Sequence, residues 1–122
     1  MEKEGYQVDM DNFMAEYKRS EVSGEEVGEL IARMAQHFCY YNMQMVTAER
    51  NFTLVARDIE NRVDENGKAI TSTKAKIFAE ATEENHLYNI ARAHVQNVEQ
   101  IINSLKSLQK GILNEFSHMG NS

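Results

Sequence analysis

The feature that most constrains the fold is an apolar stripe that repeats at helical spacing between residues 27 and 59. Successive members lie alternately four and three residues apart for more than four heptads. They are Val27, Ile31, Met34, Phe38, Tyr41, Met45, Ala48, Phe52, Val55 and Ile59. An apolar residue every 3.5 positions returns to one side of an α-helix, whereas a strand needs alternation every two. The stripe therefore predicts one long helix over about residues 24–63.

A second stripe with the same rhythm predicts another long helix over about residues 72–117. Its members are Ile77, Ala81, Glu84, Tyr88, Ala91, Val95, Val98, Ile102, Leu105, Gln109, Ile112 and Phe116. The chain contains no proline, the residue that most strongly breaks helices. The segment 64–68 is expected to end the first long helix, because Asn66 and Gly67 tolerate the left-handed backbone. With so short a link, we expect an antiparallel coiled-coil hairpin.

A shorter helix is expected ahead of the hairpin, over about residues 9–19. Met10, Phe13 and Tyr17 fall on one helical face there. The chain has 122 residues, of which 42% are apolar and 26% are charged, as in one ordinary soluble domain. We therefore expect a single all-α domain over residues 1–122, with a short N-terminal helix and a long coiled-coil hairpin.

Apolar residues beside the main stripes predict self-association. The first long helix carries the extra residues Leu30, Tyr40, Val46 and Leu54. The second carries Phe78, Leu87, Ile90, Ile101 and Leu108, which we expect to form an oligomer interface. One partner helix covers one stripe, and a short helix covers only part of a helix about 60 Å long. The simplest solution is a dimer in which two hairpins share a four-helix core.

The segment ATEENHLYNIARAH, residues 81–94, contains a spacing used by metal sites. Glu83 precedes His86 by three residues, as in the Glu-x-x-His motifs of ferritin-like di-metal bundles. Ligands in such bundles project into the core. Here Glu84 lies on the main stripe, whereas Glu83 and His86 do not. Only a dimer would bring Glu49 of the other long helix to Glu83 and His86. We therefore expect a polar helix flank, with no metal or other cofactor.

Other catalytic chemistry has little support in the sequence, and we expect a protein that is not an enzyme. It contains no Cys-x-x-Cys pair, glycine-rich phosphate loop or nucleophile elbow. The methionines Met34, Met43 and Met45 could form an adaptable binding surface, but we expect them to fill the core. Three arginines are candidate contacts for an anion or ligand held between protomers. They are Arg50, Arg57 and Arg92.

Charge and hydropathy restrict the choice of partners. The net charge of −6 predicts weak or absent direct binding to nucleic acid, which requires clustered cations. No run approaches the roughly 20 apolar residues of a membrane span, and the N-terminal residues do not resemble a secretory signal. We therefore expect a cytoplasmic protein, in a bacterial or an infected host cell, that binds a protein partner and no membrane.

Residues 40–113 resemble small helical-hairpin proteins encoded in the early or recombination regions of bacteriophage genomes. The matching positions are Ala48, Glu49, Lys74, Ala75, Thr82, Glu83, Tyr88, Ala91 and the segment SLKSLQK at residues 104–110. The resemblance implies a phage-related accessory protein and carries over no catalytic residue.

Three functions follow as hypotheses. The first is a non-enzymatic, self-associating helical binding protein of phage or prophage origin that acts on a host defence or replication component. The second is an accessory protein of phage DNA recombination that contacts single-stranded DNA. Its stacking and backbone contacts would come from Tyr40, Tyr41 and Tyr88 with the three arginines. The third is a ferritin-like metal-binding bundle.

Overall fold

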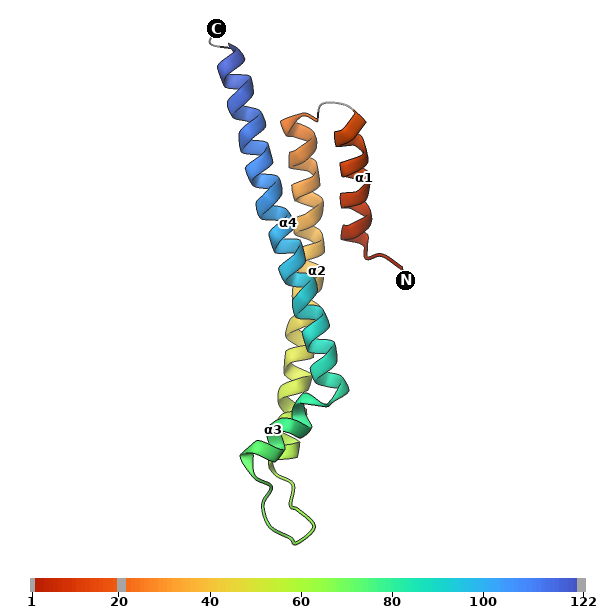
Figure 1. Ribbon diagram of the computed structural model, residues 1–122, viewed down its shortest axis with the longest axis vertical. Coiled ribbons are helices and arrows are strands. Elements are labelled where there is room, and N and C mark those ends of the chain that lie inside the picture. The colour runs from red at the N-terminus through yellow and green to blue at the C-terminus, as the bar shows by residue number, and fades with distance from the viewer. Residues whose placement is uncertain (1, 20–21, 121–122) are drawn as a thin grey trace. The chain divides into compact units, whose positions relative to one another are not determined.

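The computed structural model describes residues 2–19 and 22–120, with side chains as far as residue 115, and this part of the chain is helical. The elements in order are α1 (Gly5–Arg19), α2 (Gly24–Glu60), α3 (Ser72–Glu80) and α4 (Glu83–Gly120) (Figure 1). The only strand-like pairing within it is an isolated bridge between Val63 and Ala69. The prediction of an all-α protein is confirmed. None of the described helices has the length and apolarity needed to cross a bilayer.

The start and the packed face of α2 agree with the sequence. Ser23 caps the helix, because its hydroxyl accepts a hydrogen bond from the Glu26 backbone N at 3.1 Å. Glu25 and Glu26 in the first turn favour the helix dipole. Every member of the stripe from Val27 to Ile59 is buried or half-buried. The predicted first helix also exists, although α1 begins at Gly5, before the expected residue 9.

The end of α2 differs from the prediction, because the helix stops at Glu60 and does not reach residue 63. The following residues form a loop that Asp64 organises. Its Oδ1 accepts hydrogen bonds from the backbone N of Asn66 and of Lys68, each at 2.9 Å. Gly67 has the expected left-handed backbone, with φ of 76°, but it lies in this loop and does not cap the helix.

The predicted continuous helix over residues 72–117 is wrong, because it is broken at Ala81 and Thr82. The Thr82 hydroxyl accepts a hydrogen bond from the Asn85 backbone N at 3.2 Å and donates one to the Ala79 carbonyl at 2.7 Å. A threonine in this position satisfies a first-turn N–H of a new helix, so α4 starts afresh at Glu83.

The break changes which residues of α3 face the core. Ile77 and Ala81, both members of the predicted stripe, are exposed, whereas Ala75 and Ala79 are buried against Ile59. Beyond the break the stripe holds, since its described members from Glu84 to Ile112 are buried or half-buried. The last predicted member, Phe116, lies outside the described side chains.

The contacts divide the chain into two compact units, which are described separately. Unit 1 comprises Met1–Cys39 and Gln96–Ser122, and unit 2 comprises Tyr40–Val95. The single domain expected over residues 1–122 stays a prediction.

In unit 1, α1 runs alongside the first part of α2 (Figure 1), and its Tyr6 contacts the second part of α4. Tyr6 and Phe13 are the buried side chains of α1. The Tyr6 hydroxyl accepts a hydrogen bond from Asn97 Nδ2 of α4 at 3.4 Å. His37 Nε2 of α2 lies 2.9 Å from Asp9 Oδ2 of α1. Unit 1 is thus built from three helical segments.

Unit 2 contains the second part of α2, the Asp64 loop, α3 and the first part of α4. Its core at the α3 end is Ile59, Ala75 and Ala79, with Phe52, Val55, Ala56 and Ile70 packed around them. Ring contacts join α2 to α4 further along. Tyr41 lies 4.7 Å from His94 and Phe52 lies 6.1 Å from Tyr88, measured between ring centroids.

Candidate binding groove

A groove of about 570 Å³ lies between α2 and α4 within unit 2. Its lining residues are Tyr40, Met43, Gln44, Thr47, Ala48 and Asn51 from α2 and Glu84, Leu87, Ile90 and Ala91 from α4. Two large apolar side chains from each helix therefore border one concave surface.

The heptad pattern explains why these side chains meet. Positions 40, 44, 47 and 51 each precede a stripe residue of α2 by one. They form the row directly beside the packed stripe, because neighbouring residues on a helix are about 100° apart. On α4, Leu87 and Ile90 similarly precede the stripe residues Tyr88 and Ala91. The groove is therefore the open flank of the α2–α4 contact.

The groove has a rim of large side chains and a floor of small ones. Met43 is 73% exposed and Tyr40 is 57% exposed, so both stand out from α2. Ala91 is buried and Ala48 is half-buried between the helices. The Tyr40 ring also packs edge-on against Tyr41, at 5.1 Å between centroids, which holds the rim in place.

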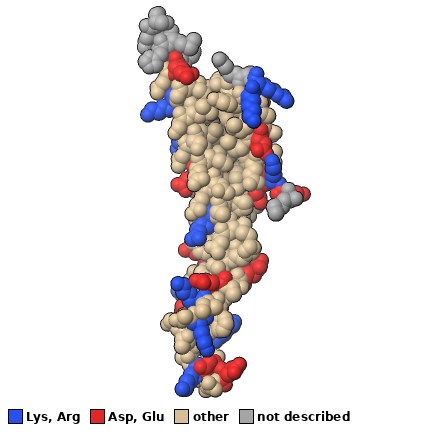
Figure 2. Space-filling model, in the orientation of Figure 1, with Lys and Arg blue, Asp and Glu red and all other residues tan. Residues whose placement is uncertain are grey.

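Charge is scarce in the groove, where Glu84 is the only ionic lining residue. Unit 2 as a whole has seven Lys or Arg against eight Asp or Glu, a balance of −1, whereas unit 1 has six against eleven, a balance of −5. On the face seen in Figure 2, side chains of both signs are mixed over the segment that holds α3 and the Asp64 loop. The acidity of the protein therefore resides mainly in unit 1.

The three candidate arginines are not drawn into one site. Arg50 and Arg57 are exposed on α2, and Arg92 is exposed on α4. The Arg92 guanidinium lies over the Tyr88 ring, 5.5 Å from its centroid, and donates to Asn89 Oδ1 at 3.4 Å. Among the described residues, no ion pair ties any of the three to a carboxylate. Their predicted role as anion contacts between protomers stays a prediction.

The Glu-x-x-His spacing lies at the start of α4. Glu83 and Glu84 occupy the first turn, where carboxylates favour the positive end of the helix dipole. Glu83, His86 and Glu49 are exposed. Within residues 2–19 and 22–115, no three His, Cys, Asp or Glu side chains are grouped to hold a metal ion. The acidic pair thus has a structural explanation in the new helix start.

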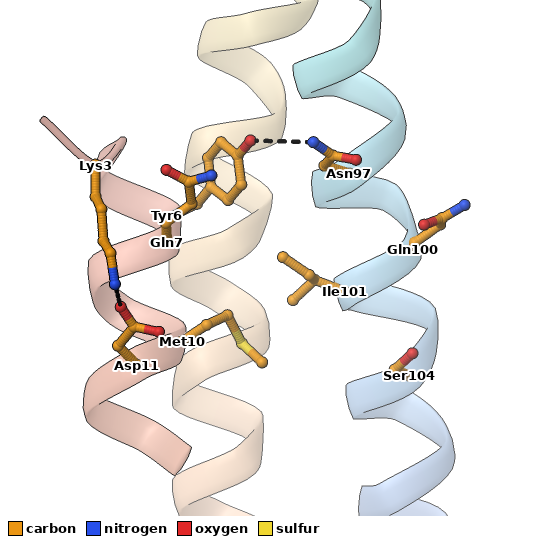
Figure 3. A pocket seen from close by; sticks show the side chains of 9 residues that line it. All are labelled: Lys3, Tyr6, Gln7, Met10, Asp11, Asn97, Gln100, Ile101 and Ser104. Atoms are coloured by element: carbon orange, nitrogen blue, oxygen red, sulfur yellow. Dashed lines mark hydrogen bonds and ion pairs between the residues drawn. The ribbon is translucent and has the colours of Figure 1, made fainter. Parts of the chain in front are cut away.

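The predicted interface residues fall into two groups. Phe78, Leu87 and Ile90 belong to unit 2 and are exposed. Ile101 and Leu108 belong to unit 1 and are half-buried. Ile101 lines a cleft of about 560 Å³ between α4 and α1, and Figure 3 shows it on the α4 side of the cleft that Met10 of α1 also lines. Ile101 thus faces α1 across this cleft.

Sequence reasoning missed two features of the candidate surfaces. The expectation that all three methionines fill the core is wrong for Met43, although Met34 is fully buried and Met45 is half-buried. The position of Met43 outside the apolar stripe of α2 was the signal in the sequence that it would be exposed. The contact between His37 and Asp9 had no sequence signal, because it joins residues 28 positions apart on different helices.

Comparisons with protein-family models, with curated proteins and with solved structures find no match for this chain.

Proposed function

We propose that this protein is a non-enzymatic, self-associating helical binding protein of phage or prophage origin that acts on a host defence or replication component. The observation that supports association with another protein chain, whether a second copy or a partner, is the groove of unit 2, where Tyr40, Met43, Leu87 and Ile90 remain exposed around a single concavity. Apolar patches rimmed by polar residues are typical of interaction surfaces. Phage origin rests on the resemblance of residues 40–113.

Self-association has support from the distribution of exposed apolar residues. Of the thirteen large apolar side chains exposed in the described part, nine belong to unit 2. Burying such side chains is favourable by about 25 cal/mol per Å² of apolar surface. A hairpin completed by a second chain would cover surface that α1 does not cover in unit 2.

A cellular assay tests the proposed action. Bacteria that express the chain are compared with controls for phage plating in the presence and absence of a defence system, and for their rate of DNA synthesis. We expect wild type to raise plating on the defended strain or to slow DNA synthesis. The charged variant Met43→Glu should lose the effect, whereas Val46→Glu, on the same helix outside the groove, should retain it. An unchanged phenotype in both assays would contradict the proposal.

The alternative of a recombination accessory protein has one observation in its favour, the exposed Arg92 guanidinium over the Tyr88 ring. A cation beside an aromatic face is a feature of single-strand binding sites. Fluorescence anisotropy with an oligothymidine across a salt series separates the two functions. We expect weak binding that falls steeply with salt. Tight, salt-resistant binding that Arg92→Ala abolishes would favour the alternative.

A further inference from the structure

We infer that the occupant of the unit 2 groove is the same groove of a second copy of this chain, in a two-fold symmetric contact. This inference rests on the proposed self-association and deepens it by assigning the surface. It narrows the predicted interface to Leu87 and Ile90, and it adds Tyr40 and Met43. A partner of another kind on the same groove is an outcome of the test below.

The exposed apolar area fits a dimer of ordinary size. Tyr40, Met43, Leu87 and Ile90 are 57%, 73%, 50% and 42% exposed. At roughly 200 Å² for a large side chain, they offer roughly 450 Å² of apolar surface per copy. Interfaces are slightly more than half apolar, so this corresponds to roughly 800 Å² in total per partner. That is about the area that each partner contributes to a stable interface.

The shape of the groove is self-complementary. A two-fold contact places the same surface on both sides, so each projection must find a hollow within that surface. The groove provides both, because Met43 and Tyr40 project from the rim while Ala48 and Ala91 form the floor. An unbranched methionine side chain adapts well to such a hollow. The rim residues of one copy can therefore pack over the alanines of the other, as knobs pack into holes between helices.

The charge distribution favours contact through unit 2 over contact through unit 1. Two copies that met through unit 1 would bring together surfaces with a balance of −5 each, whereas unit 2 carries −1. Like charges at close range oppose association. The lone carboxylate in the groove, Glu84, lies among the neutral polar residues Gln44, Thr47 and Asn51. Their amide and hydroxyl groups supply the donors that a carboxylate needs at an interface.

The test compares two glutamate substitutions on α2. Met43 is 73% exposed and lines the groove, whereas Val46 is 56% exposed and does not line it. Neither side chain is needed to fill the core, so both variants should keep the helical circular dichroism of wild type. Light scattering at micromolar concentration should give wild type and Val46→Glu a mass of twice 14.0 kDa. Met43→Glu should dissociate to 14.0 kDa, with the dimer Kd raised about 100-fold or more, because it buries a charge in each copy.

The outcomes separate this inference from the proposed function. A wild-type monomer would overturn both the groove dimer and self-association. A dimer that Met43→Glu leaves intact, or that Val46→Glu breaks equally, would overturn the groove assignment and leave self-association standing. A photoreactive benzoylphenylalanine in place of Met43 gives a second measurement that does not depend on dissociation. We expect it to cross-link to residues 40–51 or 84–91 of the other copy. Cross-links elsewhere, or only to a different protein in cells, would refute the inference.

Discussion

Replacing Tyr6 by alanine should detach α1 from the other two helical segments of unit 1, and the detached helix should unfold. Tyr6 is 1% exposed and is one of two buried side chains of α1, with Phe13 one heptad further on. Its hydroxyl accepts from Asn97 and its ring lies edge-on to His37, at 6.3 Å between centroids. A 15-residue helix is marginal in water without tertiary contacts. Undocking of α1 and loss of its helical structure should therefore occur together.

The magnitude follows from the burial. A buried aromatic side chain removes roughly 150–250 Å² from water, which at about 25 cal/mol per Å² is worth about 4–6 kcal/mol as an upper bound. Alanine retains the β-carbon, and the undocked helix hides part of the ring, so we expect a loss of about 3–4 kcal/mol. The equilibrium between docked and undocked α1 should shift by about two to three orders of magnitude.

Amide hydrogen exchange resolved by segment measures this shift. The protection factors of the α1 amides should fall by the same two to three orders of magnitude as the docking equilibrium, which corresponds to about 3–4 kcal/mol. If the free energy of docking in the wild type is smaller than this loss, α1 should lose its protection altogether. Far-UV circular dichroism should lose helical signal for as many as the 15 residues of α1. The control is Val8→Ala on the same helix, where the side chain is already 43% exposed and the change should be small.

Two results would refute the reasoning. Unchanged protection of α1 in Tyr6→Ala would show that this side chain does not hold the helix. An equal loss of protection throughout Tyr40–Val95 would contradict the division into two units, because an independent unit 2 should not respond.

Three further predictions concern the break, the loop and the metal motif. Thr82→Ala should lower the free energy of urea unfolding by about 1 kcal/mol through loss of the helix cap, whereas Thr53→Ala, which removes only a bond to the Glu49 carbonyl within α2, should not. Gly67→Ala should destabilise by about 1 kcal/mol because of its positive φ, while Gly111→Ala, at an open position in α4, should stabilise by a similar amount. Elemental analysis should find no stoichiometric iron, manganese or zinc; metal that His86→Ala removes would instead favour the ferritin-like alternative.

The sequence was sufficient to predict the packed face of α2, because a strict heptad period over residues 27–59 leaves one helical side for the core. It failed at residue 82 because two signals conflicted there. Thr82 followed by Glu83 and Glu84 is the same kind of start as Ser23 followed by Glu25 and Glu26. The apolar stripe continues through Ala81 without a gap and predicts an unbroken helix. The helix-start signal at Thr82 was therefore overlooked.

The candidate groove was predictable only in part. The exposed rows containing Tyr40, Leu87 and Ile90 follow from helical spacing, which showed that one partner helix leaves them open. The full burial of Leu30 and the partial burial of Ile101 did not follow from spacing, because burial within unit 1 depends on contacts between distant parts of the chain. Spacing identifies faces of helices, and only the tertiary contacts decide which faces remain open.

The division into a continuous and a discontinuous unit has a consequence for synthesis on the ribosome. Tyr6 and its partner Asn97 are 91 residues apart, which at ordinary rates of protein synthesis is a delay of roughly 5–20 s. Unit 2 consists of one uninterrupted stretch, Tyr40–Val95, so its contacts do not depend on the first part of the chain to be made. Unit 1 joins the oldest part of the nascent chain to the newest, Met1–Cys39 to Gln96–Ser122. We therefore expect α1 to wait with Tyr6 and Phe13 exposed and open to chaperones until the segment around Asn97 has left the ribosome.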